Sequence, residues 1–183
     1  ATKLAVERIL HDVSDATRMT YSVLRYFNAA GADASGMIGE RHQPETHLIP
    51  LVLQVATGER ESIKIFGEDY PTPDGTCLRD YIHVSDLTRA HQLTLESLLS
   101  GVGNTTYNMG NCTGYSVREI IETARSITGH AIPAVSAPRR KGDPAVLIAD
   151  SSRIREQLGW QPRYENIRDI IQSAWDWHRK EAG

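Results

Sequence analysis

The sequence predicts an α/β protein, because helix and strand signals alternate along its 183 residues. Segments rich in β-branched and aromatic residues favour buried strands, and segments with apolar residues at helical spacing lie between them. A chain of this length is long enough to bury a sizeable core. Its content of 40% hydrophobic and 23% charged residues is typical of a globular domain.

The first element is a helix over Ala1–Leu10, where apolar residues are interleaved with charged ones. No capping residue precedes this helix, and the chain has no initiator methionine. We therefore expect the chain to begin inside a helix of a longer protein, as a truncated or proteolysed form of it.

The elements up to residue 75 follow from local composition. Strands are predicted where β-branched and aromatic residues gather, a helix from an apolar run that stops at Gly58, and loops from glycines or paired prolines. In chain order they are a strand at Thr20–Phe27, a loop at 28–43, a helix at Leu48–Thr57, a strand at Ser62–Phe66 and a loop at Tyr70–Gly75.

The second half contains the clearest helix, Ser116–Thr128. Ser116 and Glu119 form a capping box, an apolar stripe follows, and Gly129 ends the helix. The other predicted elements are strands at Asp80–Val84, Thr105–Met109 and Ala145–Ala149, and helices at Asp86–Leu99 (with Asp86 as N-cap), Ser152–Leu158 and Ile167–Arg179.

Composition excludes several classes of function. A net charge of -3 argues against a general nucleic-acid binder, which needs a basic face. No apolar run approaches the roughly 18 residues of a membrane span, and we find no signal peptide. Cys77 and Cys112 have no metal-ligand spacing and are too few for a disulfide framework, so no metal centre is predicted. A cytoplasmic location is the default expectation.

Candidate ligand-binding groups occur in two segments. Asn28 follows a predicted strand, where ligands of open α/β sheets bind, or it makes a turn. Arg79 either pairs with its neighbour Asp80 or clamps a phosphate with its fork of donors. His83 and Asp86 have the residue types of an acid/base pair, but a strand position and a helix N-cap favour structural roles.

A third segment, Ala137–Asp143, places three adjacent cations in an acidic protein. A solvated charge run is one interpretation. The other is an anion site, because Pro138 and Gly142 hold the cations on a constrained loop. Lys3, taken alone, is an ordinary helical lysine with a solvated head.

Together and in this order, these segments resemble the extended short-chain dehydrogenase/reductase family, and within it the epimerases of sugar nucleotides. The resemblance covers essentially the whole chain. The DGT-x-x-RDYIHV segment is highly specific, whereas many relatives share LGW. The matching motifs are LRYFNAAGAD at 24–33, HLIP at 47–50, IKIFGEDYPTPDGTCLRDYIHVSDL at 63–87, YNMG at 107–110, APRRKGDPAVLIAD at 137–150 and LGWQPRY at 158–164.

The resemblance implies the C-terminal part of a Rossmann-type α/β protein, with the small substrate-binding domain and a few strands and helices of the cofactor domain. Residues 1–28 would end the NAD-binding domain. Residues 29–183 would be mainly the UDP-sugar-binding domain, with 80–110 returning to the Rossmann sheet. The catalytic tyrosine would lie four residues before Lys3, outside this chain. The Gly-rich dinucleotide turn is expected to be absent too, since the loop from Gly31 to Gly39 opens no helix.

The resemblance also implies roles for individual residues. Lys3 resembles the catalytic lysine that bonds the nicotinamide ribose and lowers the pKa of the tyrosine, and Tyr26 would pack near the nicotinamide. Glu45, Thr46 and His47 depart from the two asparagines common in relatives. The implied substrate contacts are Phe27 and Leu147 beside the hexose, Asn28 near the diphosphate or hexose, His47, Leu48 and Phe66 around uracil, Arg79 and Arg140 on the diphosphate, and Asp143 on a ribose hydroxyl.

The implied activity of the full-length enzyme is reversible inversion at C4 of UDP-glucose and UDP-galactose, by transient hydride transfer to NAD. The alternatives are another nucleotide-sugar epimerase or dehydratase of the same family, and a non-catalytic UDP-sugar-binding fragment. The expected partners are a UDP-sugar and a second copy of the protein, without nucleic acid or membrane. The chain alone is expected to be inactive and to bind no NAD.

Overall fold

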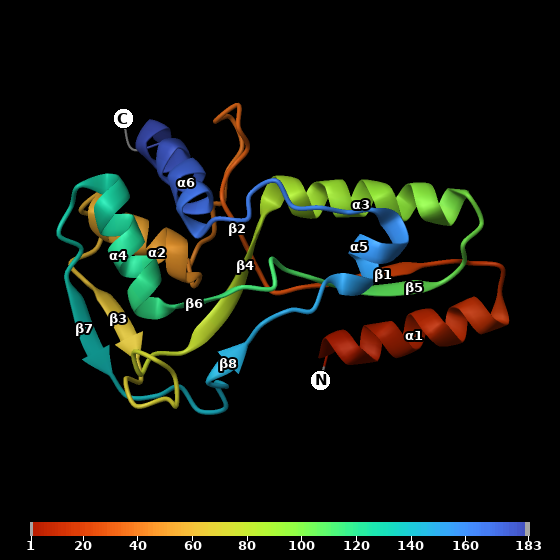
Figure 1. Ribbon diagram of the computed structural model, residues 1–183, viewed down its shortest axis with the longest axis horizontal. Helices are drawn as coiled ribbons and strands as arrows, with labels where there is room; N and C mark the ends of the chain where they lie inside the picture. The colour runs from red at the N-terminus through yellow and green to blue at the C-terminus, as the bar shows by residue number, and fades with distance from the viewer. Residues whose placement is uncertain (1, 182–183) are drawn as a thin grey trace.

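The computed structural model describes residues 2–181 and confirms the α/β class (Figure 1). The elements in chain order are α1 (Thr2–Ala16), β1 (Ser22–Tyr26), β2 (Asn28–Ala30), α2 (Leu48–Ala56), β3 (Ile63–Phe66), β4 (Leu78–His83), α3 (Val84–Leu99), β5 (Thr105–Met109), β6 (Gly114–Ser116), α4 (Val117–Thr128), β7 (Ala134–Ala137), β8 (Val146–Leu147), α5 (Ser152–Leu158) and α6 (Ile167–Glu181).

The strands form three separate groups in which parallel pairs dominate. β1 pairs with β5 and β3 pairs with β7, both in parallel. β4 is the hub of the third group: it pairs in parallel with β2 and β8, and antiparallel with β6. The β1–β5 pair lies between α1 and α3 at one end of the molecule, and the β3–β7 pair lies beside α2 and α4 at the other (Figure 1).

Two apolar cores flank β4. The first is built by α2, α4 and α6 with β3, and includes Leu53, Ile121 and Ile171. The second is built by α3, α5 and β5, and centres on Trp160. Tyr81 belongs to the first core and Ile82 to the second, because successive side chains of a strand point to opposite faces. β4 therefore ties the two cores together.

Several predicted boundaries are confirmed. α5 has the predicted bounds, and α4 carries the Ser116–Glu119 capping box with both of its hydrogen bonds. Gly129 ends α4 in the left-handed conformation, at φ 75°, which glycine adopts without steric cost. The apolar face of α4 is buried through Ile120, Ile121 and Ala124.

Other boundaries were wrong. Asp86 is not the N-cap of α3: the helix begins two residues earlier, and His83 caps it by accepting a hydrogen bond from the Ser85 amide. The predicted loop 28–43 contains the short strand β2. β6 and β7 were not predicted, because one is three residues long and the other is an exposed run of small residues, so neither carries a strong apolar signal.

The helix α1 is longer than predicted and contributes no buried residue. Its apolar side chains Leu4, Val6 and Ile9 are at least half exposed, so α1 adds to neither core. Within residues 2–181, no helix is long and apolar enough to cross a membrane.

Candidate functional site

One cavity, of about 560 Å³, gathers predicted site residues from distant parts of the sequence. It lies where the first turn of α2, the ends of β3 and β4, and the loop before β8 meet. The predicted residues that line it are Asn28, His47, Leu48, Phe66, Arg79, Arg140 and Asp143. Folding therefore brings most of the predicted substrate-binding set to one place.

The aromatic side of the cavity is formed by Phe66 and Arg140. β3 and β7 pair with Phe66 opposite Ala137, and the Gly67 amide donates to the Ala137 carbonyl at 2.9 Å. Because Ala137, the last residue of β7, pairs with Phe66, the basic loop that follows β7 begins beside Phe66. The Arg140 guanidinium carbon lies 4.0 Å from the centre of the Phe66 ring, which is a cation–π contact. An exposed cation and an aromatic face are thus held together.

The cationic side contains Arg79, whose side chain is only 13% exposed. It forms an ion pair with Asp143 and donates to the carbonyls of Pro144, at 2.8 Å, and Leu78, at 2.7 Å. A guanidinium has five N–H donors, so these three bonds leave two donors for an anion. Arg79 is oriented by the protein before any ligand arrives.

The alternative ion pair between Arg79 and Asp80 is not formed, because adjacent strand residues point to opposite faces. Asp80 is fully buried. Its carboxylate accepts from the backbone amides of Asn111 at 2.8 Å, Cys112 at 3.0 Å and Ala149 at 3.0 Å. Burial raises the pKa of Asp80, and these amide bonds oppose that rise.

This carboxylate fixes two loops on the face of β4 opposite Arg79. It ties the turn after β5 to the residue Ala149, which follows β8. A Cβ on Gly110 would lie 2.4 Å from the Asp80 Oδ2 atom, so only glycine allows this approach. Asp80 therefore has a structural role, which is to hold Asn111, Cys112 and Ala149 in place.

His83 and Asp86 also have structural contacts. The Nδ1 atom of His83 accepts from the Ser85 amide, so the ring proton is on Nε2, 3.1 Å from the Ser173 hydroxyl. The ring stacks on Tyr164 at 3.8 Å, and burial lowers the pKa of His83. Asp86 accepts from the backbone amides of Arg163 and Tyr164. Neither residue lines the 560 Å³ cavity, and they form no acid/base pair with each other.

Four predicted site residues lie outside this cavity. Lys3 and Tyr26 form an exposed pair at the end of β1, with the Lys3 ammonium 6.0 Å from the Tyr26 ring centre. Phe27 is half-buried between β1 and β2. Leu147 is 43% exposed on β8, opposite Arg79 in the strand register. The proposed contacts of these residues stay predictions.

The sequence analysis missed Cys77 and Tyr81, which line the cavity with Arg79. Side chains along a strand alternate between its two faces, so positions 77, 79 and 81 lie on one face. Cys77 and Tyr81 could therefore have been predicted from the assignment of Arg79 to the site. Burial raises the pKa of both the Tyr81 hydroxyl and the Cys77 thiol. Glu45 and Thr46 also line the cavity, at the entry to α2.

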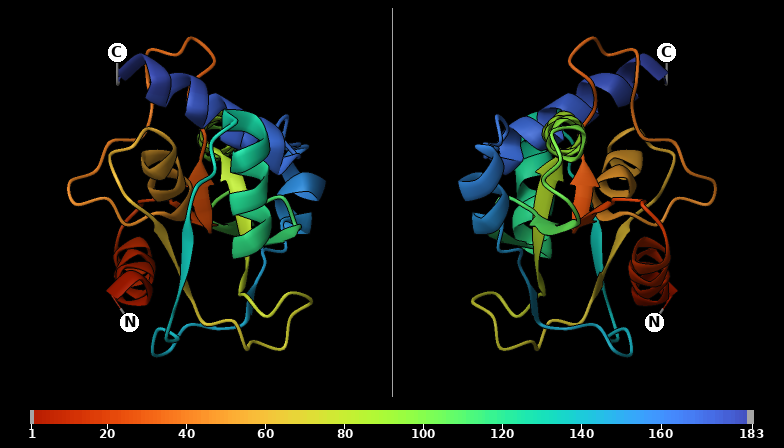
Figure 2. Two further views of the ribbon diagram at one scale, coloured as in Figure 1. Left: turned by 90° about the vertical axis from the view of Figure 1, so that its left-hand side faces the viewer. Right: turned by 90° about the vertical axis from the view of Figure 1, so that its right-hand side faces the viewer.

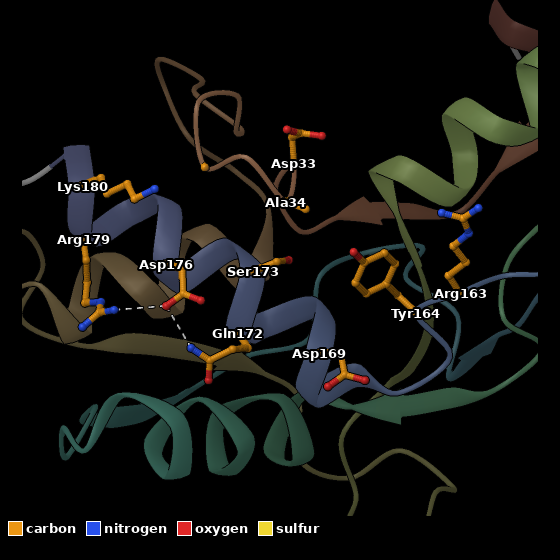
Figure 3. Close-up of a pocket in the computed structure, with 11 residues that line it drawn as sticks. Asp33, Ala34, Arg163, Tyr164, Asp169, Gln172, Ser173, Asp176, Arg179 and Lys180 are labelled. Atoms are coloured by element: carbon orange, nitrogen blue, oxygen red, sulfur yellow. Dashed lines mark hydrogen bonds and ion pairs between the residues drawn. The ribbon is translucent and has the colours of Figure 1, made fainter.

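A larger cavity, of about 750 Å³, lies between the loop after β2 and α6 (Figure 3). Its lining is mainly charged, and Asp176 is already bonded to Gln172 and Arg179. In the described part of the chain, none of the predicted site residues lines it. The candidate site is therefore the smaller cavity, because seven of the predicted substrate-binding residues line it.

The chain is similar to one family model and to proteins of known function and structure. Residues 1–110 match the model of the "NAD dependent epimerase/dehydratase family". The UDP-glucose 4-epimerase of Halalkalibacterium halodurans is 54% identical over 98% of this chain and 54% of its own. A crystal structure of a UDP-glucose 4-epimerase superposes with a TM-score of 0.95 at 58% identity, covering 98% of this chain and 55% of that one.

A second crystal structure, UDP-glucose 4-epimerase from Brucella ovis in complex with NAD, gives a TM-score of 0.91 at 46% identity. That match covers 95% of this chain and 54% of the other. The chain thus spans about half the length of the relatives it matches.

Proposed function

This chain belongs to the NAD dependent epimerase/dehydratase family, and on that premise we propose that it forms the UDP-sugar-binding part of a UDP-glucose 4-epimerase. The reaction is the reversible inversion at C4 of UDP-glucose and UDP-galactose. The observation that carries the proposal is the cavity in which Phe66, Arg79 and Arg140 meet. An aromatic face suits a base, and two guanidinium groups suit a diphosphate, because bidentate donors match its oxygens.

Residues of this chain would hold the nucleotide in a fixed position while the sugar rotates in the site. Phe66 would stack on the uracil, and Arg79 and Arg140 would bind the diphosphate. Asp143 would accept a hydrogen bond from a ribose hydroxyl, and its ion pair with Arg79 would keep that guanidinium in place. Binding energy taken from the nucleotide, which does not react, would then orient the hexose for chemistry at C4.

The pair Lys3 and Tyr26 fits the cofactor side of the same enzyme. It lies at the carboxyl end of β1, beside the parallel strand β5, and open α/β sheets bind ligands beyond such ends. NAD, when bound, supplies the reversible acceptor for the C4 hydride. Lys3 would donate to the cofactor's ribose, and its charge would favour the ionised form of a neighbouring tyrosine.

The domain assignment is part of this proposal. Residues 1–28 would belong to the cofactor domain and 29–183 mainly to the UDP-sugar domain, with 80–110 returning to the cofactor sheet. Parallel pairing of β5 with β1 supports that return. A homodimer of the full-length protein is also proposed, and the exposed apolar side chains of α1 are a surface of the kind that packs against further protein.

The test is conversion of UDP-galactose to UDP-glucose by the full-length protein supplied with NAD. Arg140→Ala should lower kcat/KM by roughly 30- to 700-fold, because loss of a charged partner at a desolvated site costs about 2 to 4 kcal/mol. Arg139→Ala is the matched control: Arg139 bonds Asp69, lies over the Tyr70 ring and does not line the cavity. No turnover of either sugar would reject the proposal, and a product that has lost water would instead identify a dehydratase.

A further inference from the structure

A long loop joins β2 to α2 and projects from the body of the molecule (Figures 1 and 2). Its second half carries two carboxylates and two imidazoles within eight residues: Glu40, His42, Glu45 and His47. No metal site was predicted here, because only the two cysteines were considered as ligands. The loop ends at His47, the N-cap of α2, which also lines the 560 Å³ cavity.

The side chains of Glu40, His42 and His47 converge on one point. The Glu40 Oε1 atom is 2.9 Å from His47 Nδ1 and 3.1 Å from His42 Nε2. One ligand atom from each of the three residues lies within 4.8 Å of the others. The His42 and His47 rings are tilted by 53° with centroids 5.1 Å apart, so the two rings do not stack on each other.

These separations suit a small transition-metal ion. Zn²⁺ binds imidazole nitrogen and carboxylate oxygen at about 2.0 to 2.2 Å, which places the ligand atoms of a tetrahedral site roughly 3.3 Å apart. The observed N···O separations of 2.9 and 3.1 Å need only a slight expansion. Mg²⁺ and Ca²⁺ prefer all-oxygen ligands, so two imidazoles disfavour them.

An ordinary surface ion pair explains this arrangement less well. Such a pair joins one exposed imidazole to exposed carboxylates, as His11 does with Asp12 at 3.8 Å and Asp15 at 3.4 Å. Here two imidazoles share one oxygen of Glu40, whose side chain is only 19% exposed. Each imidazole keeps about half of its surface open, so an ion can reach the ligand atoms from solvent.

Glu45 supports the arrangement from the adjoining position. Its Oε1 atom lies 2.9 Å from His47 Nδ1 and accepts the backbone amides of Thr46, at 2.6 Å, and His47, at 2.7 Å. Because these two bonds already hold it, Glu45 fixes the start of α2 and adds negative charge beside the three ligands. That charge favours a cation at the point where the ligand atoms meet.

We propose that Glu40, His42 and His47 form a binding site for one divalent transition-metal ion of the Zn²⁺ type. Three protein ligands leave a fourth position for water or another small ligand. The ion would tie the loop to the first turn of α2 and so fix the wall of the cavity that contains His47 and Leu48. The site stands on these contacts alone and does not depend on the proposed epimerase activity.

The test is calorimetric titration of Zn²⁺ into the tag-free, full-length protein after removal of metal with a chelator. Glu40→Gln and His42→Gln should each weaken binding at this site by at least about tenfold, since even outer-shell changes cost 10- to 100-fold at metal sites. His11→Gln is the control, because it removes an imidazole that faces a carboxylate outside the cluster. It should leave both the affinity and the number of bound ions unchanged.

Two further measurements keep the test decisive if a substituted protein is poorly folded. Co²⁺ added to the unsubstituted protein should give the intense visible bands of a four-coordinate site, and Mg²⁺ should neither bind nor compete. The proposal is overturned if no saturable Zn²⁺ binding occurs, if binding persists unchanged in both Glu40→Gln and His42→Gln, or if Co²⁺ gives only the weak spectrum of the hydrated ion.

Discussion

Replacing Asp80 by asparagine tests how the buried carboxylate of β4 holds the two loops bound to it. The carboxylate accepts three backbone amides: Asn111 on Oδ1, and Cys112 and Ala149 on Oδ2. Asparagine offers one acceptor oxygen, which will take the Oδ2 position because two donors meet there. The Asn111 amide then faces an NH₂ group and loses its partner. One unsatisfied buried donor costs about 1 to 3 kcal/mol, and this is the expected loss of stability.

Asp80→Ala removes all three bonds and should cost more, at least about 3 kcal/mol at the low end of the same scale. Urea unfolding of the full-length protein measures both changes from shifts of the midpoint at constant slope. Asp12→Asn is the control: the Asp12 side chain is 84% exposed, and such surface changes stay within about 0.5 kcal/mol. Equal losses for Asp80→Asn and Asp80→Ala, or no loss for either, would show that these three hydrogen bonds do not stabilise the fold in this way.

Two other outcomes are expected. If Leu147 on β8 faces the hexose, the full-length enzyme should prefer UDP-galactose over UDP-N-acetylgalactosamine by about 10- to 200-fold in kcat/KM. Leu147→Tyr should increase this ratio of kcat/KM values, and Leu147→Ser should decrease it. If neither substitution changes the ratio, Leu147 does not contact the sugar. The free energy of unfolding should fall as the pH drops through about 6.5. Burial lowers the pKa of His83 and of His178 in the folded protein, so the unfolded chain binds protons at these two residues first. His83→Gln should make that decline shallower, and an identical slope in thermal melts would contradict the assignment.

Strong local patterns were sufficient to predict much of the fold. The capping box at Ser116 and the apolar stripe behind it define α4 through interactions within a few residues of one another. The same holds for α5, whose bounds match the prediction. By contrast, β6 and β7 exist because partner strands supply their hydrogen bonds, and a three-residue segment such as Gly114–Ser116 has no local preference strong enough to reveal it.

Some residues of the site could also be predicted from the sequence, and others could not. The resemblance placed Phe66, Arg79 and Arg140 in one pocket, and the structure brings them there. Asp80 had no predicted role beyond a possible pair with its neighbour Arg79, because the three amides that Asp80 holds come from segments about 31 and 69 residues away. The cluster of Glu40, His42 and His47 depends on the path of an irregular loop, which no periodicity encodes.

We propose that the 560 Å³ cavity binds a uridine diphosphate, with Phe66 on the base and Arg140 on the diphosphate. The most direct measurement is calorimetry of uridine and of UDP with the full-length protein and two variants. Arg140→Ala should weaken UDP binding by about 2 to 4 kcal/mol and change uridine binding much less, because uridine carries no phosphate. Phe66→Ala should weaken both ligands. Equal weakening of uridine and UDP by Arg140→Ala, or no effect on UDP, would contradict the account.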